Sequence, residues 1–370
     1  MLKFSKYFVG ILFIISGLIK LNDPTGFSIK LEEYFVLFGL TFLNPLVLTL
    51  SVFICALEVI LGVALLLSLR NKLTAWLLLI LIVFFTILTG YSAISGKVTD
   101  CGCFGDAIKL SPWQSFMKDV ILLALILIIF KSKEKLTSAF SEIRQLSILL
   151  STTLIAILFG VFCLFYLPVV DFLPYKIGNN IPEQMKVPVG AITDSFTTVM
   201  TYEKEGLQKE FDLKNYPWQD STWKWLKTEN KLIREGVKPK IKDLRIADAD
   251  GNDYSEDFIT YAGARLWVVS NELEKVNPIV LASISALAVQ LEKEYKISTI
   301  GLTASSDIAT ENIRHELNIM FSFYYCDATT LKTMVRSNPG VLLIQNGVII
   351  NKWAFRALPS AKEIATQINK

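Results

Sequence analysis

The sequence predicts a polytopic α-helical membrane bundle followed by a soluble α/β domain. Of the 370 residues, 52% are hydrophobic and only 19% are charged, whereas soluble domains carry roughly a quarter charged residues. The apolar excess lies before Pro168. The rest of the chain has the composition of a globular domain and alternates strand-like with helix-like patterns. The first part is therefore suited to lipid and the second to water.

Five apolar runs predict five transmembrane helices. Each run is near or above the ~20 residues needed to cross about 30 Å of hydrocarbon. Each must be helical, because lipid offers no hydrogen-bond partners to its backbone. The runs cover residues 4–21, 43–69, 73–94, 113–130 and 146–167. Between the first two, residues 27–40 mix charged with apolar side chains, which predicts a short amphipathic segment at the membrane interface.

Lysine and arginine flank alternate connections between these helices and predict their orientation. Cytoplasmic connections carry the excess of basic residues. The residues that carry this bias are Lys3, Lys6, Arg70, Lys72, Lys131, Lys133, Lys135 and Arg144. We therefore expect a cytoplasmic N-terminus. The loops at residues 22–42 and 95–112, and everything after the fifth helix, are expected on the opposite side.

The soluble part reads as β-α-β-α-β-β-α, which predicts a mixed sheet. The clearest local signal is Asn346-Gly347 between two apolar runs, which is typical of a hairpin. The expected elements are strands at 265–270, 297–302, 341–344 and 348–353, helices at 276–295, 307–318 (capped by Ser306 or Asp307) and from 360, and a short strand candidate at 243–247. We divide the chain into a four-helix membrane domain (1–131), a cytoplasmic loop with the fifth helix (132–168), a linker and extension (169–239) and the soluble domain (240–370).

Composition excludes several kinds of chemistry. The only histidine is His315, so bis-histidine haem, histidine-rich zinc sites and Ser-His-Asp triads are excluded. We predict no metal site. The net charge is only +3 and no basic stripe interleaved with aromatic residues is present, so nucleic acid is not an expected partner.

The most informative segment is the outward loop Asp100-Cys101-Gly102-Cys103-Phe104-Gly105-Asp106. A disulfide that closes so small a ring is strained, and strained disulfides are easily reduced. Gly102 and Gly105 give the backbone freedom for a turn. Three interpretations stay open: a thiol–disulfide redox couple formed by Cys101 and Cys103, a static disulfide that staples the loop, and a pair of thiolates that binds a soft metal.

Glu58 lies about halfway along the second apolar run, where an ionisable group must face the bundle interior and have a partner. It is a candidate for proton transfer, with a protonated, hydrogen-bonded carboxyl as the alternative. Four more charged residues at outer helix ends are interpreted as snorkelling cations and caps: Lys20, Asp23, Lys118 and Asp119. Cys163 and Cys326 are expected to be buried fillers.

Three features together resemble the DoxX-like membrane family, and more narrowly its MauE branch, over residues 1–131. They are Ser16-Gly17-Leu18-Ile19-Lys20, a glutamate in the second helix, and Cys101-Gly102-Cys103-Phe104-Gly105. The layout is similar to DoxX-type proteins of Bacteroidota. The resemblance implies disulfide formation on exported proteins, with a quinone as candidate electron acceptor. It also implies the inner membrane as location, with the C-terminal domain in the periplasm.

The soluble domain resembles a thioredoxin-like fold over residues 240–370. The match rests on Asp248-Ala249-Asp250-Gly251, the strand RLWVVS and the run from Ser337 to Leu343, in which Pro339 stands where thioredoxins place a cis-proline. The sequence departs from that family where the redox Cys-x-x-Cys should follow RLWVVS, because this chain reads Asn271-Glu272-Leu273-Glu274-Lys275. The domain is therefore expected to bind partners near Asn338 and Pro339 without dithiol chemistry of its own.

These observations favour a membrane-bound thiol–disulfide redox or maturation factor that acts through Cys101, Cys103 and Glu58. A quinone ring could stack on Trp113 and Phe116 beside the loop. The alternative is a non-enzymatic accessory or scaffold subunit of an inner-membrane complex, so enzymatic activity stays open at this point. A small-molecule transporter draws little support, because the helices lack paired Gly/Pro breaks. The expected partners are the lipid bilayer and either an exported client protein or such a complex.

Overall fold

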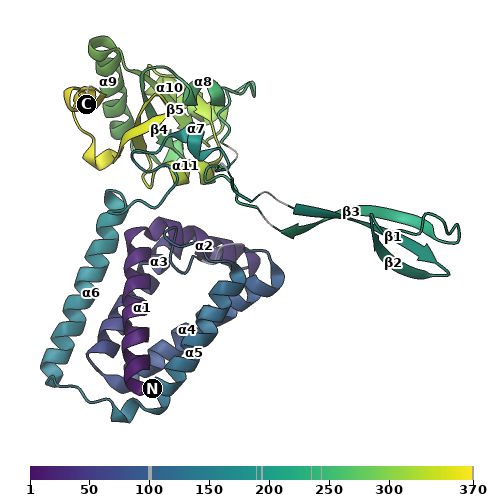
Figure 1. Cartoon of the computed structure of the whole chain (residues 1–370). Coiled ribbons are helices and arrows are strands. Elements are labelled where there is room, and N and C mark those ends of the chain that lie inside the picture. The colour runs from purple at the N-terminus through teal and green to yellow at the C-terminus, as the bar shows by residue number, and fades with distance from the viewer. Residues whose placement is uncertain (99–101, 189, 193–194, 235, 243, 369–370) are drawn as a thin grey trace.

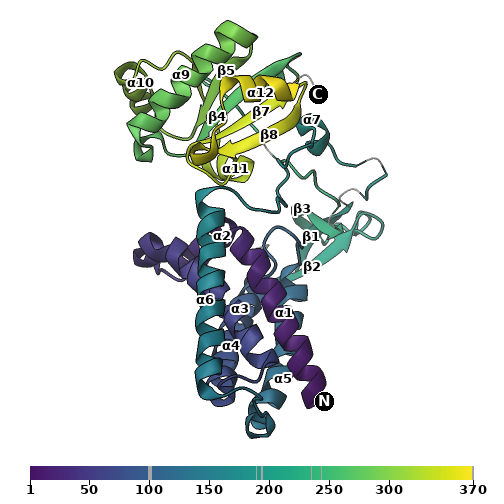
Figure 2. The same ribbon diagram turned by 90° about the vertical axis from the view of Figure 1, so that its left-hand side faces the viewer.

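The computed structural model describes residues 1–98, 102–188, 190–192, 195–234, 236–242 and 244–368. This part of the chain forms a bundle of long helices, an α/β domain beyond one end of the bundle, and a three-stranded sheet that projects sideways from the junction (Figure 1). Turning the molecule by 90° shows the α/β domain above the same end of the bundle (Figure 2).

Five helices within the described residues are long and apolar enough to cross a membrane, which confirms the five predicted spans. They are α1 (Leu2–Asn22), η1 with α3 (Thr41–Leu46 and Val47–Leu66), α4 (Asn71–Ser95), α5 (Pro112–Lys131) and α6 (Glu142–Phe165). The segment expected at the interface is helix α2 (Pro24–Leu37). Its Phe27, Leu31 and Tyr34 follow one another by about one helical turn and are buried against the bundle.

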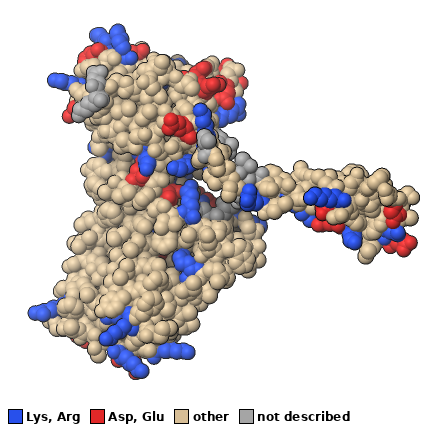
Figure 3. Space-filling model, viewed as in Figure 1, with Lys and Arg blue, Asp and Glu red and all other residues tan. Residues whose placement is uncertain are grey.

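The loop that contains Cys103 and the α/β domain lie at the same end of the bundle. Helix α1 ends there, and Asn22 makes two hydrogen bonds to the chain that leaves α6: its Nδ2 donates to the carbonyl of Val170 (2.7 Å), and its Oδ1 accepts from the Val170 amide (2.9 Å). Lysine and arginine side chains stand at the opposite end (Figure 3). This arrangement is the one the sequence predicts; which side of the membrane each end faces stays a prediction.

The α/β domain is built on a five-stranded mixed sheet in the order β6-β5-β4-β7-β8. Strands β4, β5 and β6 are parallel, while β7 is antiparallel to both β4 and β8. The turn between β7 and β8 has positive φ at both Asn346 (50°) and Gly347 (78°), as an Asn-Gly hairpin requires. The strands are β4 (Ala264–Ser270), β5 (Ser298–Thr303), β6 (Phe323–Tyr325), β7 (Gly340–Gln345) and β8 (Val348–Ala354).

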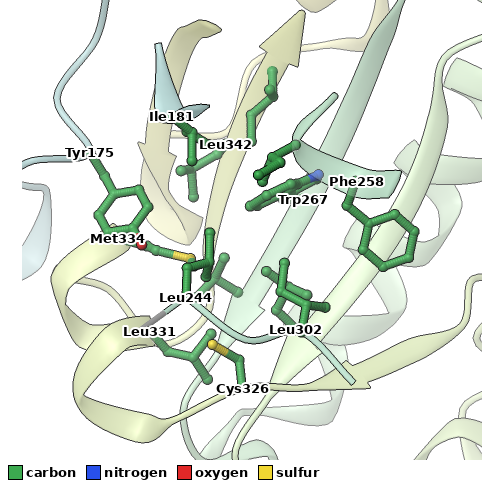
Figure 4. Packing of buried hydrophobic residues seen from close by; sticks show 14 of the residues in the cluster. Tyr175, Ile181, Leu244, Phe258, Trp267, Leu302, Cys326, Leu331, Met334 and Leu342 are labelled. Atoms are coloured by element: carbon green, nitrogen blue, oxygen red, sulfur yellow. The ribbon is translucent and has the colours of Figure 1, made fainter. Parts of the chain in front are cut away.

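Both faces of this sheet are covered. Alternation along β4 sends Leu266 and Val268 to one face, under α9 and α12, and Trp267 and Val269 to the other. Figure 4 shows the second core, in which Trp267 lies beside Ile181, Leu342 and Phe258, with Leu331 and Met334 of α11 on the other side of the same cluster. The helices of the domain are α7 (Ile181–Gln184), α8 (Ser255–Ile259), α9 (Pro278–Tyr295), α10 (Asp307–Glu316), α11 (Ala328–Met334) and α12 (Ala361–Ile368). Two short 3-10 helices, η3 (Leu273–Lys275) and η4 (Phe355–Ala357), follow β4 and β8, and a third, η2 (Lys133–Lys135), follows α5 in the bundle.

The structure corrects two details of the sequence analysis. The stretch after residue 170 is not only a linker, since Tyr175 and Ile181 are buried in the core of the α/β domain. The short strand expected at 243–247 does not form in its described part, because Ala247 makes only isolated bridges, to Asp253 and Tyr325; residue 243 lies outside the described residues. Proline and glycine in the first stretch concealed a few well-spaced apolar residues.

The third body is an antiparallel sheet in the order β2-β1-β3, which the sequence analysis did not foresee. Its strands are β1 (Ser195–Lys204), β2 (Leu207–Asp212) and β3 (Lys224–Arg234). The register places Met200 opposite Phe211 on one face and Thr201 opposite Glu210 on the other, where Lys231 bonds to Glu210 at 2.6 Å. One face is therefore aromatic and the other charged.

The role of residue 181 in the core can be tested against a near neighbour. Ile181→Ala should destabilise the α/β domain by about 2–5 kcal/mol, because it removes a fully buried side chain. Ile177→Ala is the matched control, since that side chain is 52% exposed. Amide hydrogen exchange of β7 and β8 in the full-length protein should accelerate in the first variant alone. Equal exchange in both variants would restore the interpretation of this stretch as a linker.

Candidate functional site

Helices α1 and α3 approach each other closely at glycines. A Cβ on Gly17 would lie 2.7 Å from the Val59 side chain and 2.8 Å from the Cys55 carbonyl. A Cβ on Gly62 would lie 2.7 Å from the carbonyl of Gly10. Small residues at such a seam let two membrane helices pack backbone to backbone. This close packing fixes where Ser16 and Lys20 of α1 lie along the length of α3.

Beside this helix contact, Lys20 and Glu58 form a buried ion pair, and their side chains are only 3% and 4% exposed. Ser16 Oγ lies 3.0 Å from the second carboxylate oxygen of Glu58. The ammonium group also lies over the rings of Phe27 (5.1 Å) and Phe85 (5.0 Å). Glu58 faces the interior and has a partner, as predicted. The interpretation of Lys20 as a snorkelling cation is wrong, because its ammonium group points into the bundle.

Ser16 connects this pair to the cysteine loop. Its hydroxyl oxygen lies 3.0 Å from the carbonyl oxygen of Cys103 as well as 3.0 Å from Glu58. A serine hydroxyl has one hydrogen and can donate to only one of them at a time. Rotation of this hydroxyl therefore switches one hydrogen bond between the loop and the carboxylate.

A second, partly buried ion pair lies on α5. Lys118 Nζ is 2.6 Å from Asp119, whose side chain is 1% exposed and also accepts a hydrogen bond from Thr89 Oγ1 (3.0 Å). Lys118 lies 5.5 Å from the centre of the Phe104 ring in the cysteine loop. Asp119 is therefore not the exposed helix-end residue that the sequence suggested. Asp23 does act as a cap, since its carboxylate accepts from the Gly26 amide at the start of α2.

These groups line one cavity in the bundle. Its walls include Ser16, Lys20, Glu58, Cys103 and Asp119. The space open to the centres of water molecules is about 30 Å³, which suits about two waters. Trp113 and Phe116 are not among the lining residues, and the Trp113 side chain is 58% exposed on the outer surface of the bundle.

Only part of the cysteine loop can be placed. Cys101 lies outside the described residues, whereas Cys103 is half-buried. Gly102 and Gly105 have positive φ values of 64° and 51°, which agrees with the turn expected from two glycines. Cys163 and Cys326 are buried, as expected of fillers, and Cys55 is buried as well. Burial and the neighbouring Asp327 carboxylate raise the pKa of Cys326 to about 12, so this thiol is inert at neutral pH.

The α/β domain contacts the loop through a residue that the sequence analysis missed. Arg336, three residues before Pro339, donates from Nε to Asp23 (2.9 Å) and from Nη2 to Asp106 (3.3 Å). Its side chain is 4% exposed. A second ion pair joins Lys352 of β8 to Asp171 after α6. Arginine suits such a position because its planar group serves two carboxylates at once.

The region expected to bind partners is closed by its own hydrogen bonds. The Asn338–Pro339 peptide bond is cis, as the thioredoxin-like resemblance implies. Pro339 is buried, and both amide atoms of Asn338 are engaged: Oδ1 accepts from Ser270 (2.7 Å) and Nδ2 donates to the Glu272 carbonyl (2.9 Å). Asn338 thus closes the place where a dithiol would lie in a thioredoxin.

Residues 1–132 match the family model of the methylamine utilisation protein MauE. The membrane part of this chain is MauE-like. With its fifth helix and the thioredoxin-like α/β domain, the chain is a multi-pass membrane protein of two different folds. The charged cavity and the loop with Cys103 belong to the MauE-like bundle.

The chain also matches a second family model and one curated protein. Residues 196–235, a range that includes most of the projecting sheet, match a domain of unknown function, DUF8463. Protein TlpB of Flavobacterium psychrophilum is 30% identical over 128 residues, which are 34% of this chain and 35% of that protein. The chain therefore matches about a third of the length of this curated relative.

The buried pair of the MauE-like bundle makes a sharp prediction about stability. Lys20→Met or Glu58→Gln should each destabilise the bundle by about 3–5 kcal/mol, because each leaves an unpaired charged or polar partner in the interior. The double variant should recover most of this loss. Thermal unfolding of the full-length protein in detergent measures it, with Lys97→Met at an exposed position as control. Additive losses in the double variant would show that the two side chains are not coupled.

Proposed function

We propose that this chain is a membrane-bound thiol–disulfide redox factor that acts on exported proteins through Cys101 and Cys103. The supporting observation is that Cys103 lines the same cavity as the buried ion pair Lys20–Glu58 and the partly buried pair Lys118–Asp119. Disulfide chemistry moves protons together with electrons. Charged groups buried beside a cysteine loop are costly to maintain, and a role in moving those protons accounts for them.

The proposed reaction is a balanced exchange. A client thiolate attacks one sulfur of the Cys101–Cys103 disulfide and releases the other as a thiolate. A second client thiolate then attacks the mixed disulfide, so the client leaves oxidised and the loop keeps two electrons as a dithiol. Transfer of two electrons and two protons to a quinone gives the hydroquinone and restores the disulfide.

Glu58 has the role of proton acceptor in this proposal. Its carboxylate is paired with Lys20, and the Ser16 hydroxyl lies within hydrogen-bond distance of both this carboxylate and the loop. The cavity has room for about two water molecules, which would complete a path from the cysteines. A quinone would meet the loop from the lipid side, where Trp113 is exposed at the start of α5.

The thioredoxin-like domain positions the loop in this proposal. Arg336 ties it to Asp106, three residues after Cys103. Client binding near Asn338 and Pro339 stays a prediction, and both amide atoms of Asn338 already bond within the domain.

The second candidate function is a non-enzymatic scaffold or accessory subunit of an inner-membrane complex. The thioredoxin-like domain favours it, because residues 271–275 stand where the dithiol is expected, and Asn338 donates a hydrogen bond to the Glu272 carbonyl in that segment. In that case the loop cysteines form a permanent staple, and exchange with a client thiol does not occur.

A trapping experiment separates the two functions. Cys103→Ser in the full-length protein leaves Cys101 without its partner, so a mixed disulfide between Cys101 and a client that has a single cysteine cannot resolve. We expect a single-cysteine peptide, added as a mixed disulfide with glutathione, to become linked to Cys101 in nanodiscs, with glutathione as the leaving thiol. The wild type should oxidise a reduced two-cysteine peptide. Cys326→Ser is the control and should leave peptide oxidation by the intact loop unchanged, because that thiol is buried. No adduct in the first variant and no peptide oxidation by the wild type would favour the scaffold.

A further inference from the structure

A groove lies beside the cysteine loop, between the bundle and the α/β domain. It consists of two adjoining hollows with volumes of about 410 and 310 Å³, which share Lys109, Pro174 and Lys240. Asp106 and Ala107, three and four residues after Cys103, line the second hollow. The groove therefore begins next to the part of the loop that carries the proposed chemistry.

Lysines dominate the walls of this groove. Lys109, Lys176, Lys240 and Lys242 line it, and all four are exposed. Among the described residues, Lys176, Lys240 and Lys242 form no ion pair, and Lys109 has only Asp106 at 4.0 Å. Basic side chains are visible at the waist between the two main bodies (Figure 3).

The carboxylates that line the groove are already engaged. Asp106 accepts a hydrogen bond from Arg336, and Asp327 accepts from the Thr330 amide at the start of α11. They offset the lysines only in part, so the groove keeps a positive potential. A concave wall focuses such a potential and attracts negative charge.

We propose that this groove binds an acidic segment of a client polypeptide and so brings the client's cysteines to Cys101 and Cys103. This inference rests on the proposed redox function and adds the substrate class to it. The shape supports a peptide, because two hollows in a row accept several residues of extended chain. Thr329, Thr330 and Thr333 also line the groove. The hydroxyls of Thr330 and Thr333 donate to Asp327 and to the Thr329 carbonyl, and their oxygens can still accept from the N–H groups of a peptide backbone.

Binding should depend strongly on charge and salt. The lysines are exposed, so their attraction is screened within about 10 Å at 0.1 M salt. Lys240→Glu with Lys242→Glu reverses two charges in one hollow. We expect this variant to bind an acidic peptide at least about tenfold more weakly than the wild type. The matched control is Lys293→Glu with Lys362→Glu, which makes the same change of charge at exposed positions on α9 and α12.

The experiment uses the full-length protein in nanodiscs of neutral phosphatidylcholine. The probe is a fluorescein-labelled peptide of alternating glutamate and glycine without cysteine, and its fluorescence anisotropy reports binding. We expect saturable binding that weakens with salt, falls at least about tenfold in the groove variant, and changes less than about twofold in the control. Equal loss in both variants would overturn the proposal, because net charge alone would then explain the binding.

A second arm tests the other anionic ligand that lies near this groove, a lipid headgroup. If the peptide does not bind in neutral nanodiscs, but phosphatidylglycerol nanodiscs protect Lys240 and Lys242 from acetylation, the groove is a lipid site and the proposal is wrong. The cysteine-free probe also separates this proposal from the redox function. Binding that survives Cys101→Ser with Cys103→Ser supports the groove even where client oxidation fails.

Discussion

Charge inside a membrane bundle must be paired, and in this protein that requirement fixes how α1 lies against α3. Glu58 is in the middle of an apolar helix, and Lys20 reaches it only because the glycines of the two helices allow their backbones to touch. An unpaired partner in hydrocarbon costs several kcal/mol. The same contact places Ser16 under the carbonyl of Cys103. The height of the cysteine loop, the cavity and the proposed proton path all follow from this one pairing.

A second set of charges joins the bundle to the thioredoxin-like domain. Arg336 lies almost fully buried between Asp23, which caps α2, and Asp106 in the cysteine loop. A shift of the domain would therefore break hydrogen bonds in the loop itself. The domain has no dithiol of its own beside its cis-proline, and it touches the loop that does carry cysteines. In the proposed function the bundle carries the cysteine chemistry, and the thioredoxin-like domain positions the cysteine loop.

The sequence predicted most of the fold, because its strongest signals are local. Five apolar runs, the Asn346-Gly347 turn and the helix that starts after Ser306 all appear where expected. Glu58 was found for a physical reason, since a carboxylate in lipid needs a partner. Lys20 and Asp119 were misjudged because their positions near helix ends suggested exposure. The partner of each is set by packing between helices, which a single sequence does not reveal.

Other residues were missed because their role depends on distant contacts. Nothing local marks Arg336, whose partners are 313 and 230 residues away. The projecting sheet was not predicted, because one face of its strands is rich in lysine and glutamate, and such a composition is typical of a polar loop. The lysine groove assembles residues 109, 176, 240 and 242 from three separate segments. Such sites exist only after folding.

We propose that Cys101 and Cys103 alternate between dithiol and disulfide, and their redox state in living cells distinguishes this cycle from a permanent disulfide. Mass-tagging of thiols after rapid acid quenching would give the fraction of each form with respiration active and with it blocked. We expect a mixture of the two forms that shifts toward the dithiol when the quinone pool becomes reduced. A pair that stays fully oxidised in both conditions would contradict it.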